Sequence, residues 1–332
     1  MNDYAVDGQV VVDSLRVQSA GEAGGEGGVG VGVGADSTVS IDGAAVQSQN
    51  SGAARASVAF ESGAQLEAND NRRGVVRITA DGGDQVIQAN VSGDASQEGD
   101  GRVVVSGDDG AQGTFIVVGE GNVSANGDGQ VTAAVGEGGQ VVYRQYDGER
   151  SDDDESQEQF IANGTATAEL YYQQASESGE SSGDRAVNVV NYGQDTTVEV
   201  TERSASTLNA TVERSQSEGK VVLVSVSEAA MENAESTSVY VDGEAAAEAS
   251  SYSEVASAAN GGDNSAFLVR SSSSAEATTD VVVGINGFSE RELSMQADGG
   301  DGTTSSGGQP GFGAVAALVA LVGAALLATR RR

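Results

Sequence analysis

The sequence predicts a mainly β protein in which two β-rich regions precede a short apolar segment near the C-terminal end. Two observations predict this fold class. Short runs rich in Val, Ile and Thr recur about every ten residues, and Gly, Asp and Asn separate many of them, which is the spacing of sandwiches, barrels and β-solenoids. Several runs also alternate polar and apolar residues, as in Thr197-Val198-Glu199-Val200-Thr201, so that one face of the strand can be buried.

Residues 1–146 are expected to form a Gly-rich β domain, either a sandwich or in part a β-solenoid. The strands predicted here cover residues 10–12, 37–41, 56–60, 75–79, 85–91, 102–106, 114–118, 130–135 and 140–143. Residues 21–34 include Gly25-x-Gly27-x-x-Gly30, which formally matches a dinucleotide-binding loop. A Rossmann unit needs a helix directly after that loop, and the sequence does not predict one, so we expect a flexible or edge-strand segment.

Residues 147–159 are predicted to form an acidic exposed loop or interdomain link, because charged residues and Ser surround Asp152-Asp153-Asp154-Glu155. Oxygen ligands suit Ca²⁺, which makes Asp152, Asp153 and Asp154 a weak candidate calcium site. Their spacing matches neither an EF-hand nor a calcium-binding nonapeptide repeat. A solvated run of charge is the simpler interpretation.

Residues 160–296 are expected to form a second β domain. The strands predicted here cover residues 165–172, 186–190, 196–201, 208–212, 221–226, 238–241, 266–269, 281–285 and 292–295. One short helix is predicted over residues 251–260, because Ser251 and Glu254 have capping-box spacing and Asn260-Gly261-Gly262 provides a stop. The simplest architecture is an immunoglobulin-like sandwich with a helical crossover, followed by a flexible tether over residues 297–309.

The charge balance is strongly acidic. The part before Pro310 contains all 50 acidic residues and 14 of the 17 basic ones, a net charge of −36, and Lys220 is the only lysine. Such a chain repels itself in dilute buffer, whereas at molar salt the Debye length falls to about 3 Å and the repulsion largely disappears. In these features the chain resembles proteins of extreme halophiles. A nucleic-acid partner is excluded, because phosphate binding needs clustered Lys and Arg.

The absence of Cys and His removes whole classes of chemistry. Disulfides, Cys or His zinc ligands, thiol nucleophiles and His-based triads are all excluded. Glycoside hydrolysis needs only two carboxylates, but 50 acidic residues always supply a pair, and the chain has no Trp for a sugar platform. We therefore expect no enzyme activity and no cofactor.

Four Asn-x-Ser/Thr sequons are candidate N-glycosylation sites if the chain is exported, at Asn90, Asn122, Asn163 and Asn209. Such tripeptides also arise by chance in a chain rich in Ser and Thr, so the sequence alone does not choose among them.

The residues after Pro310 form a marginal membrane span. Residues 312–328 contain no charged side chain, and as a helix they would extend about 25 Å, close to the lower limit for crossing a bilayer. Arg330, Arg331 and Arg332 follow them and would hold that end in the cytoplasm as a stop-transfer signal. This pattern predicts a transmembrane helix with the β-rich regions outside the cell.

Pro310, Gly311 and Phe312, followed by a short apolar helix and an Arg cluster, resemble the PGF-CTERM sorting tail of archaeal surface proteins. The resemblance covers residues 310–332 and implies an archaeosortase as partner, removal of the tail near the tripeptide, and attachment of the mature C-terminus to a membrane lipid. It implies no biochemical activity.

Together these observations predict a structural or envelope-associated surface protein of a halophilic archaeon. A surface-displayed module that binds a solute, a polysaccharide or a neighbouring cell is the alternative. The first residues contain no recognisable signal peptide, so we expect Met1 to be a late start within a longer reading frame.

Overall fold

The computed structural model describes residues 2–6, 9–23, 55–69, 71–107, 110–126, 129–146, 149–174, 185–272 and 278–297. All of them belong to the first of two compact units, Met1–Asp298 and Gly299–Arg332. Four expected parts lie outside the described residues. They are the strand at residues 37–41, most of the glycine-rich residues 21–34, nearly all of the tether and the whole apolar tail. Within the described part, no helix is long and apolar enough to cross a membrane.

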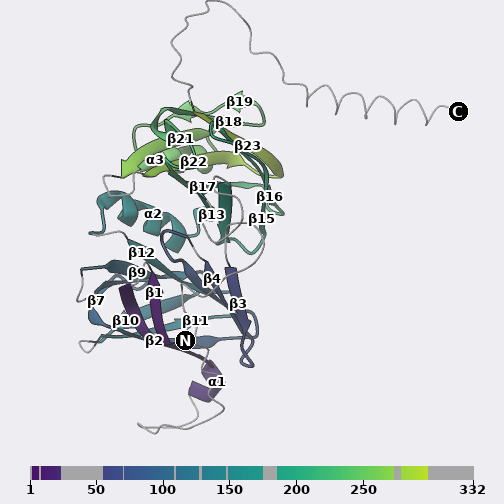
Figure 1. Ribbon diagram of the computed structural model, residues 1–332. Helices are drawn as coiled ribbons and strands as arrows, with labels where there is room; N and C mark the ends of the chain where they lie inside the picture. Colours follow the sequence, from purple (N-terminus) through teal and green to yellow (C-terminus); the bar gives the residue numbers. More distant parts are fainter. Residues whose placement is uncertain are drawn as a thin grey trace, which may run out of the picture. The chain divides into compact units, whose positions relative to one another are not determined.

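Two antiparallel sheets make up the first region (Figure 1). Sheet A has the order β1 (Asn2–Val6), β2 (Gln9–Ser19), β6 (Gln85–Val91), β11 (Gln130–Val135) and β10 (Gly121–Ala125), and α1 (Ala20–Ala23) follows β2. Sheet B has the order β3 (Arg55–Ala59), β4 (Ala64–Asn69), β5 (Val76–Ala80), β12 (Gln140–Tyr146), β9 (Gln112–Val118), β8 (Arg102–Gly107) and β7 (Gly93–Glu98). The antiparallel pairing contradicts the solenoid alternative for these strands, because a β-helix stacks parallel strands.

One hydrophobic core joins sheets A and B. Ile87 and Val131 of sheet A pack in the same cluster as Leu66, Ile78 and Phe115 of sheet B. The strands β6 and β11 carry strict alternation of buried and less buried residues, which is why their bounds agree with the predicted ones.

Two further sheets make up the second region. Sheet C has the order β14 (Arg185–Asn191), β13 (Ala166–Gln174), β17 (Glu218–Ser227), β22 (Thr278–Gly287), β21 (Ala266–Ser272) and β20 (Ala247–Glu248). Sheet D has the order β15 (Thr196–Arg203), β16 (Thr207–Arg214), β23 (Glu290–Ala297), β18 (Thr237–Val241) and β19 (Glu244–Ala245), with the 3₁₀ turn η1 (Ala234–Ser236) before β18. Their shared core includes Leu170 and Val283 of sheet C and Leu208, Leu293 and Met295 of sheet D.

The mainly β prediction is confirmed, and the immunoglobulin-like topology of the second region stays a prediction. Sheet C departs from a purely antiparallel sandwich because β13 pairs with β17, and β20 with β21, in parallel. The predicted helix is confirmed as α3 (Tyr252–Ala259), whose N-cap Ser251 accepts the backbone N–H of Glu254.

A second helix corrects the expectation of an acidic loop over residues 147–159. This helix, α2 (Asp152–Ala162), begins after Ser151, and Ser151 and Asp154 form a complete capping box. Four acidic residues occupy its first turn, where the helix dipole favours negative charge. In Figure 1 α2 lies between the strands of the first and second regions, and it contacts both β9 and β13.

A third core contains α2, α3 and the faces of sheets B and C that the other cores leave free. Ile116 and Val142 of sheet B join Phe160 of α2, Val255 of α3 and Leu223 of sheet C. The strands β9 and β12 are therefore buried on both faces. Any polar side chain that projects from them into this core needs a partner there.

Candidate functional site: a buried charge network between sheets B and C

The third core contains an ion pair that is sealed from solvent. Arg144 of β12 and Glu169 of β13 are 0% and 1% exposed, and the Nη2 of Arg144 lies 2.7 Å from the Oε1 of Glu169. The same Nη2 donates to the Oε1 of Gln157, on α2, over 3.1 Å. The hydroxyl of Tyr192 donates to the second oxygen of Glu169. This pair therefore connects sheet B, α2 and sheet C.

Protonation states in this part of the network are fixed by opposite charges. Burial works against a charged Arg144, but the Glu169 carboxylate and the neighbouring tyrosines together outweigh it and raise the pKa of Arg144 well above its ordinary value. Burial and the same carboxylate raise the pKa of Tyr171 and Tyr192 well above the ordinary value. The guanidinium thus stays charged and both phenols stay neutral at any physiological pH.

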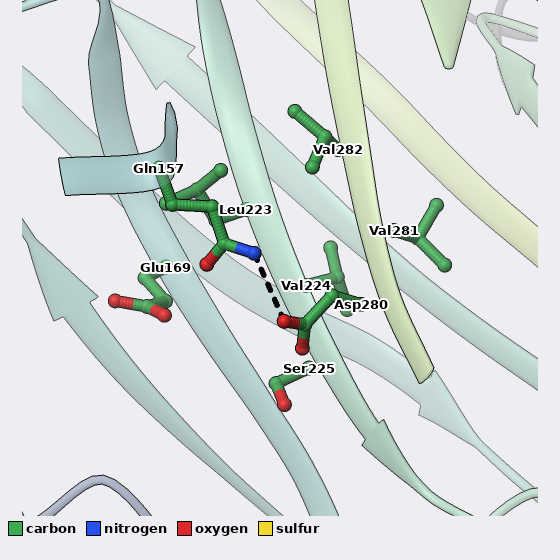
Figure 2. Close-up of a pocket in the computed structure, with 8 residues that line it drawn as sticks. All are labelled: Gln157, Glu169, Leu223, Val224, Ser225, Asp280, Val281 and Val282. Atoms are coloured by element: carbon green, nitrogen blue, oxygen red, sulfur yellow. Dashed lines mark hydrogen bonds between the residues drawn. The ribbon is translucent and has the colours of Figure 1, made fainter. Parts of the chain in front are cut away.

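Arg73, in the loop between β4 and β5, connects sheet B to two acidic residues. Its Nη1 lies 2.7 Å from the Oδ1 of Asp154 in α2, and its Nη2 lies 2.9 Å from the Oδ2 of Asp280 in β22. The side chain of Gln157 donates to the same oxygen of Asp280 over 2.9 Å, as Figure 2 shows. The guanidinium also lies 5.3 Å from the centre of the Tyr146 ring.

These contacts hold both carboxyl groups ionised. Burial alone would raise the pKa of Asp154, but Arg73 and the hydrogen bonds from Ser151 lower it to about 2. The pKa of Asp280 is likewise lowered, because Arg73 and Gln157 outweigh its burial.

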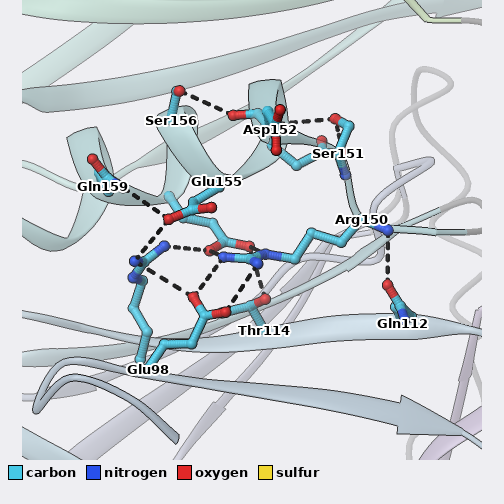
Figure 3. A network of polar contacts seen from close by, with 12 residues as sticks. Glu98, Gln112, Thr114, Arg150, Ser151, Asp152, Glu155, Ser156 and Gln159 are labelled. Atoms are coloured by element: carbon cyan, nitrogen blue, oxygen red, sulfur yellow. Dashed lines mark hydrogen bonds and ion pairs between the residues drawn. The ribbon is translucent and has the colours of Figure 1, made fainter. Parts of the chain in front are cut away.

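Glu158 of α2 is the centre of the other half of the network. Figure 3 shows this half with Glu98, Thr114 and Arg150 labelled. It is fully buried, and its carboxylate lies 2.8 Å from the Nη1 of Arg102 and 2.7 Å from the Nη2 of Arg150. It also accepts hydrogen bonds from the hydroxyls of Thr114 and Tyr146, over 2.8 and 2.5 Å. These bonds lower the pKa of Glu158 despite its burial. A second carboxylate, Glu98 of β7, takes two further bonds from Arg150.

The network leaves no room for a ligand at its centre. Gln157, Glu169, Ser225 and Asp280 line a gap between α2 and sheet C, drawn in Figure 2, that is too narrow to admit a water molecule. A general acid at neutral pH needs a carboxyl group with a raised pKa, whereas Asp154, Glu158 and Asp280 have lowered ones. The arrangement is suited to holding the two regions in register.

The acidic residues singled out in the sequence belong to this helix and its contacts. Asp154 caps α2 and pairs with Arg73, and Asp153 lies 3.4 Å from Arg270 of β21. Asp152 also lies in the first turn of α2. Across the described residues, no group of three or more acidic side chains is arranged to hold a metal ion.

The four sequons fall into two pairs. Asn122 and Asn163 are exposed, at an edge strand and at the end of α2. Asn90 and Asn209 lie in strands with a neighbour on each side, and each side-chain amide donates a hydrogen bond to the neighbouring strand.

Sequence reasoning missed the network itself. Arg144 follows Val141-Val142-Tyr143, and Glu169 lies within the apolar strand β13, so each is a single charge in an otherwise buried strand. Two such charges of opposite sign are the signal that could have indicated a pair. Nothing in the sequence shows that these two strands meet.

Comparisons with known proteins identify only the end of the chain. The family model described as the PGF-CTERM motif matches residues 309–331. The chain carries this sorting motif. The match includes Pro310, Gly311 and Phe312, so the resemblance seen in the sequence is confirmed. A PGF-CTERM tail indicates an archaeal protein that is exported, processed at its C-terminal end by an archaeosortase and anchored at the cell surface.

The remaining comparisons do not assign the chain to a protein family. Curated proteins give no match. Among solved structures, a mutant of a family 81 glycoside hydrolase from Clostridium thermocellum aligns with 12% identity and a TM-score of 0.31, over 74% of this chain and 27% of the enzyme chain. The chain thus spans about a quarter of that enzyme's length, and this low likeness carries no argument about activity.

Proposed function

We propose that the chain is a non-catalytic structural component of the envelope of a halophilic archaeon. In this proposal an archaeosortase removes the tail after Pro310-Gly311-Phe312 has been recognised, and a lipid on the new C-terminus holds the β-rich regions outside the cytoplasmic membrane. Arg330, Arg331 and Arg332 stop transfer of the chain before processing. The PGF-CTERM match carries the surface location, and the buried network carries the structural role.

The network supports a passive role because it consists of ionised groups that already have partners. Asp154, Glu158, Glu169 and Asp280 each contact a guanidinium or an amide over 2.7 to 2.9 Å. Each carboxylate is paired with a guanidinium, although the Nε and Nη1 of Arg144 and the Oδ1 of Asp280 have no hydrogen-bond partner among the described residues. A rigid connection between sheets B and C is of use to a protein that bears load in an envelope.

The distribution of charge supports the halophilic setting. Of the 14 basic residues before Pro310, at least eight are engaged in ion pairs within the described part of the chain, namely Arg73, Arg77, Arg102, Arg144, Arg150, Arg214, Arg270 and Arg291. Five of these guanidiniums have side chains that are 13% exposed or less: Arg73, Arg102, Arg144, Arg150 and Arg214. With so many cations used internally, the outer surface keeps an excess of carboxylates, which remain hydrated and screened at high salt.

Cross-linking on intact cells at molar salt tests this proposal. Lys220 is the only lysine, and its Nζ donates to the carbonyl of Gly164, so a carboxyl-reactive cross-linker is the appropriate reagent. We expect cross-links to further copies of the chain or to other envelope proteins. Co-purification of a specific solute or polysaccharide in place of such lateral contacts would contradict the proposal and favour a binding module.

A further inference from the structure

We propose that Asn122 and Asn163 carry N-linked glycans and that Asn90 and Asn209 stay unmodified. The inference rests on export of the chain, as in the proposed function. The glycosidic bond forms between the Nδ2 of Asn and the anomeric carbon of a phosphate-activated oligosaccharide. The bond from that carbon to the phosphate oxygen breaks, the phosphate leaves with the electron pair, and the proton lost by Nδ2 passes to water. The state of Nδ2 in the folded chain therefore separates the four sites.

Asn122 lies on β10, one of the two edge strands of sheet A, where it is paired with Ala134 of β11. Both Asn122 and Ser124 are exposed, while Val123 between them is buried in the first core. The two-residue period of a strand thus puts the amide and the hydroxyl of the sequon on one solvent-facing side. The side chain of Asn122 has no hydrogen-bond partner within the described ranges.

Asn163 follows the last turn of α2 and is also exposed. Its Oδ1 accepts the backbone N–H of Thr165 over 2.9 Å, and no described residue accepts a bond from its Nδ2. Gly164 beside it borders open space, since a Cβ built there would meet nothing within 4 Å. The Nδ2 of Asn163 can therefore take a sugar without the loss of a hydrogen bond to any described residue.

Asn90 differs although it is exposed and lies in the same sheet as Asn122. It stands on β6, directly between Ser14 of β2 and Gln130 of β11. Its Nδ2 donates to the Oγ of Ser14 over 2.8 Å. A sugar on this nitrogen would have to fit between the side chains of two neighbouring strands.

Asn209 is held in the same manner in sheet D. It stands on β16 between Glu202 of β15 and Ser294 of β23, and it is half-buried. Its Nδ2 donates to the Oε2 of Glu202 over 2.9 Å. Glycosylation would disturb this charge-assisted bond, which is stronger than a neutral one.

Peptide mass spectrometry of the full chain, purified from the surface of its own exporting cells, tests the assignment. Trypsin cleaves after Arg, which places each sequon in a separate peptide, residues 78–102, 103–144, 151–185 and 204–214. We expect an added oligosaccharide mass on peptides 103–144 and 151–185, and the unmodified mass for peptides 78–102 and 204–214.

Matched variants show which residue carries each mass. Asn122→Gln and Ser124→Ala each remove one glycan mass from the intact chain, whereas Asn90→Gln leaves the mass of the attached sugar unchanged. Surface-exposed chain with a bare Asn122, or with sugar on Asn90 or Asn209, overturns the assignment while leaving the envelope proposal intact. Chain that is found only inside the cell, with all four sites bare, overturns export and both proposals.

Discussion

Replacing Arg144 by Met leaves the carboxylate of Glu169 in the third core without its counter-ion. Both side chains are at most 1% exposed, so water cannot replace the lost partner. Opposite charges about 4 Å apart attract by about 4 kcal/mol at the effective dielectric of a protein. Removing one member of a buried pair costs about 3–5 kcal/mol, because the remaining charge stays desolvated. We therefore expect Arg144→Met to lower the free energy of unfolding by that amount.

Urea unfolding at constant molar salt measures this loss. With a slope of about 3 kcal/mol per molar urea, the midpoint should fall by about 1–2 M. The control is Arg291→Met, because Arg291 pairs with Asp242 where the two side chains are 30% and 39% exposed. Solvent screens such a pair, and its loss should cost less than about 1 kcal/mol.

A double variant separates the unpaired charge from other effects of the substitution. Arg144→Met with Glu169→Leu removes both charges and should regain most of the stability, because a hydrophobic replacement of a buried pair is often neutral. An Arg144→Met midpoint equal to that of Arg291→Met, or a double variant no more stable than the single one, would refute the reasoning.

Three further predictions concern acid, salt and packing. The pKa of Asp154 falls from 3.8 to about 2 on folding, so its contribution of about 2 kcal/mol is present above pH 4 and disappears as the pH falls towards 2. Unfolding midpoints of Asp154→Asn should therefore depend less on pH over this window than those of the unaltered chain, and an equal dependence would contradict the assignment. Raising the salt concentration from 0.1 to 2 M should increase the melting temperature, because salt screens the repulsion among side chains whose net charge before Pro310 is −36. A decrease of the melting temperature in calorimetry would count against the halophilic setting. A Cβ at Gly284 would lie 2.4 Å from the carbonyl oxygen of Val255, so Gly284→Ala should displace α3 and lower the free energy of unfolding in urea by about 1–3 kcal/mol. The control Gly101→Ala, which has open space around the new Cβ, should lower it less. Equal losses would show that α3 does not pack on β22 as described.

The strands that sequence reasoning predicted best are those with one buried face. Gln85–Val91 and Gln130–Val135 alternate strictly, so local pattern and tertiary environment agree on their bounds. The edge strand at residues 93–98 was missed for the opposite reason. The strand β7, Gly93–Glu98, is mostly polar and has no buried residue, so its strand conformation depends on pairing with β8.

The buried network escaped prediction because its partners are distant in the sequence. The predicted strand ended at residue 143, since Arg144 breaks the apolar run, but Glu169 neutralises that charge and the strand continues to Tyr146. Asp154 was assigned to a loop, whereas its helix depends on a local cap by Ser151 and on Arg73, 81 residues away. The ion pair could not be inferred from the sequence.

The tail was the part of the chain that sequence reasoning identified most completely, because its signal is an ordered motif that requires no tertiary contact. Pro310-Gly311-Phe312, the uncharged run and the arginines are contiguous, and the PGF-CTERM match includes them from residue 309 to residue 331. The function of the two β-rich regions depends on how side chains that are distant in the sequence come together. The sequence alone therefore did not decide between an envelope component and a binding module.

The most direct test of the account is the location of the chain with and without residues 310–332. The unaltered chain should be recovered in the membrane fraction at molar salt, without the tail, which is cut near Pro310-Gly311-Phe312, and with a lipid at its new C-terminus. Deletion of residues 310–332 should release the β-rich regions into the medium, folded and free of lipid. Continued membrane retention of the deleted form, or an intact tail on the mature surface protein, would contradict anchoring through a processed sorting motif.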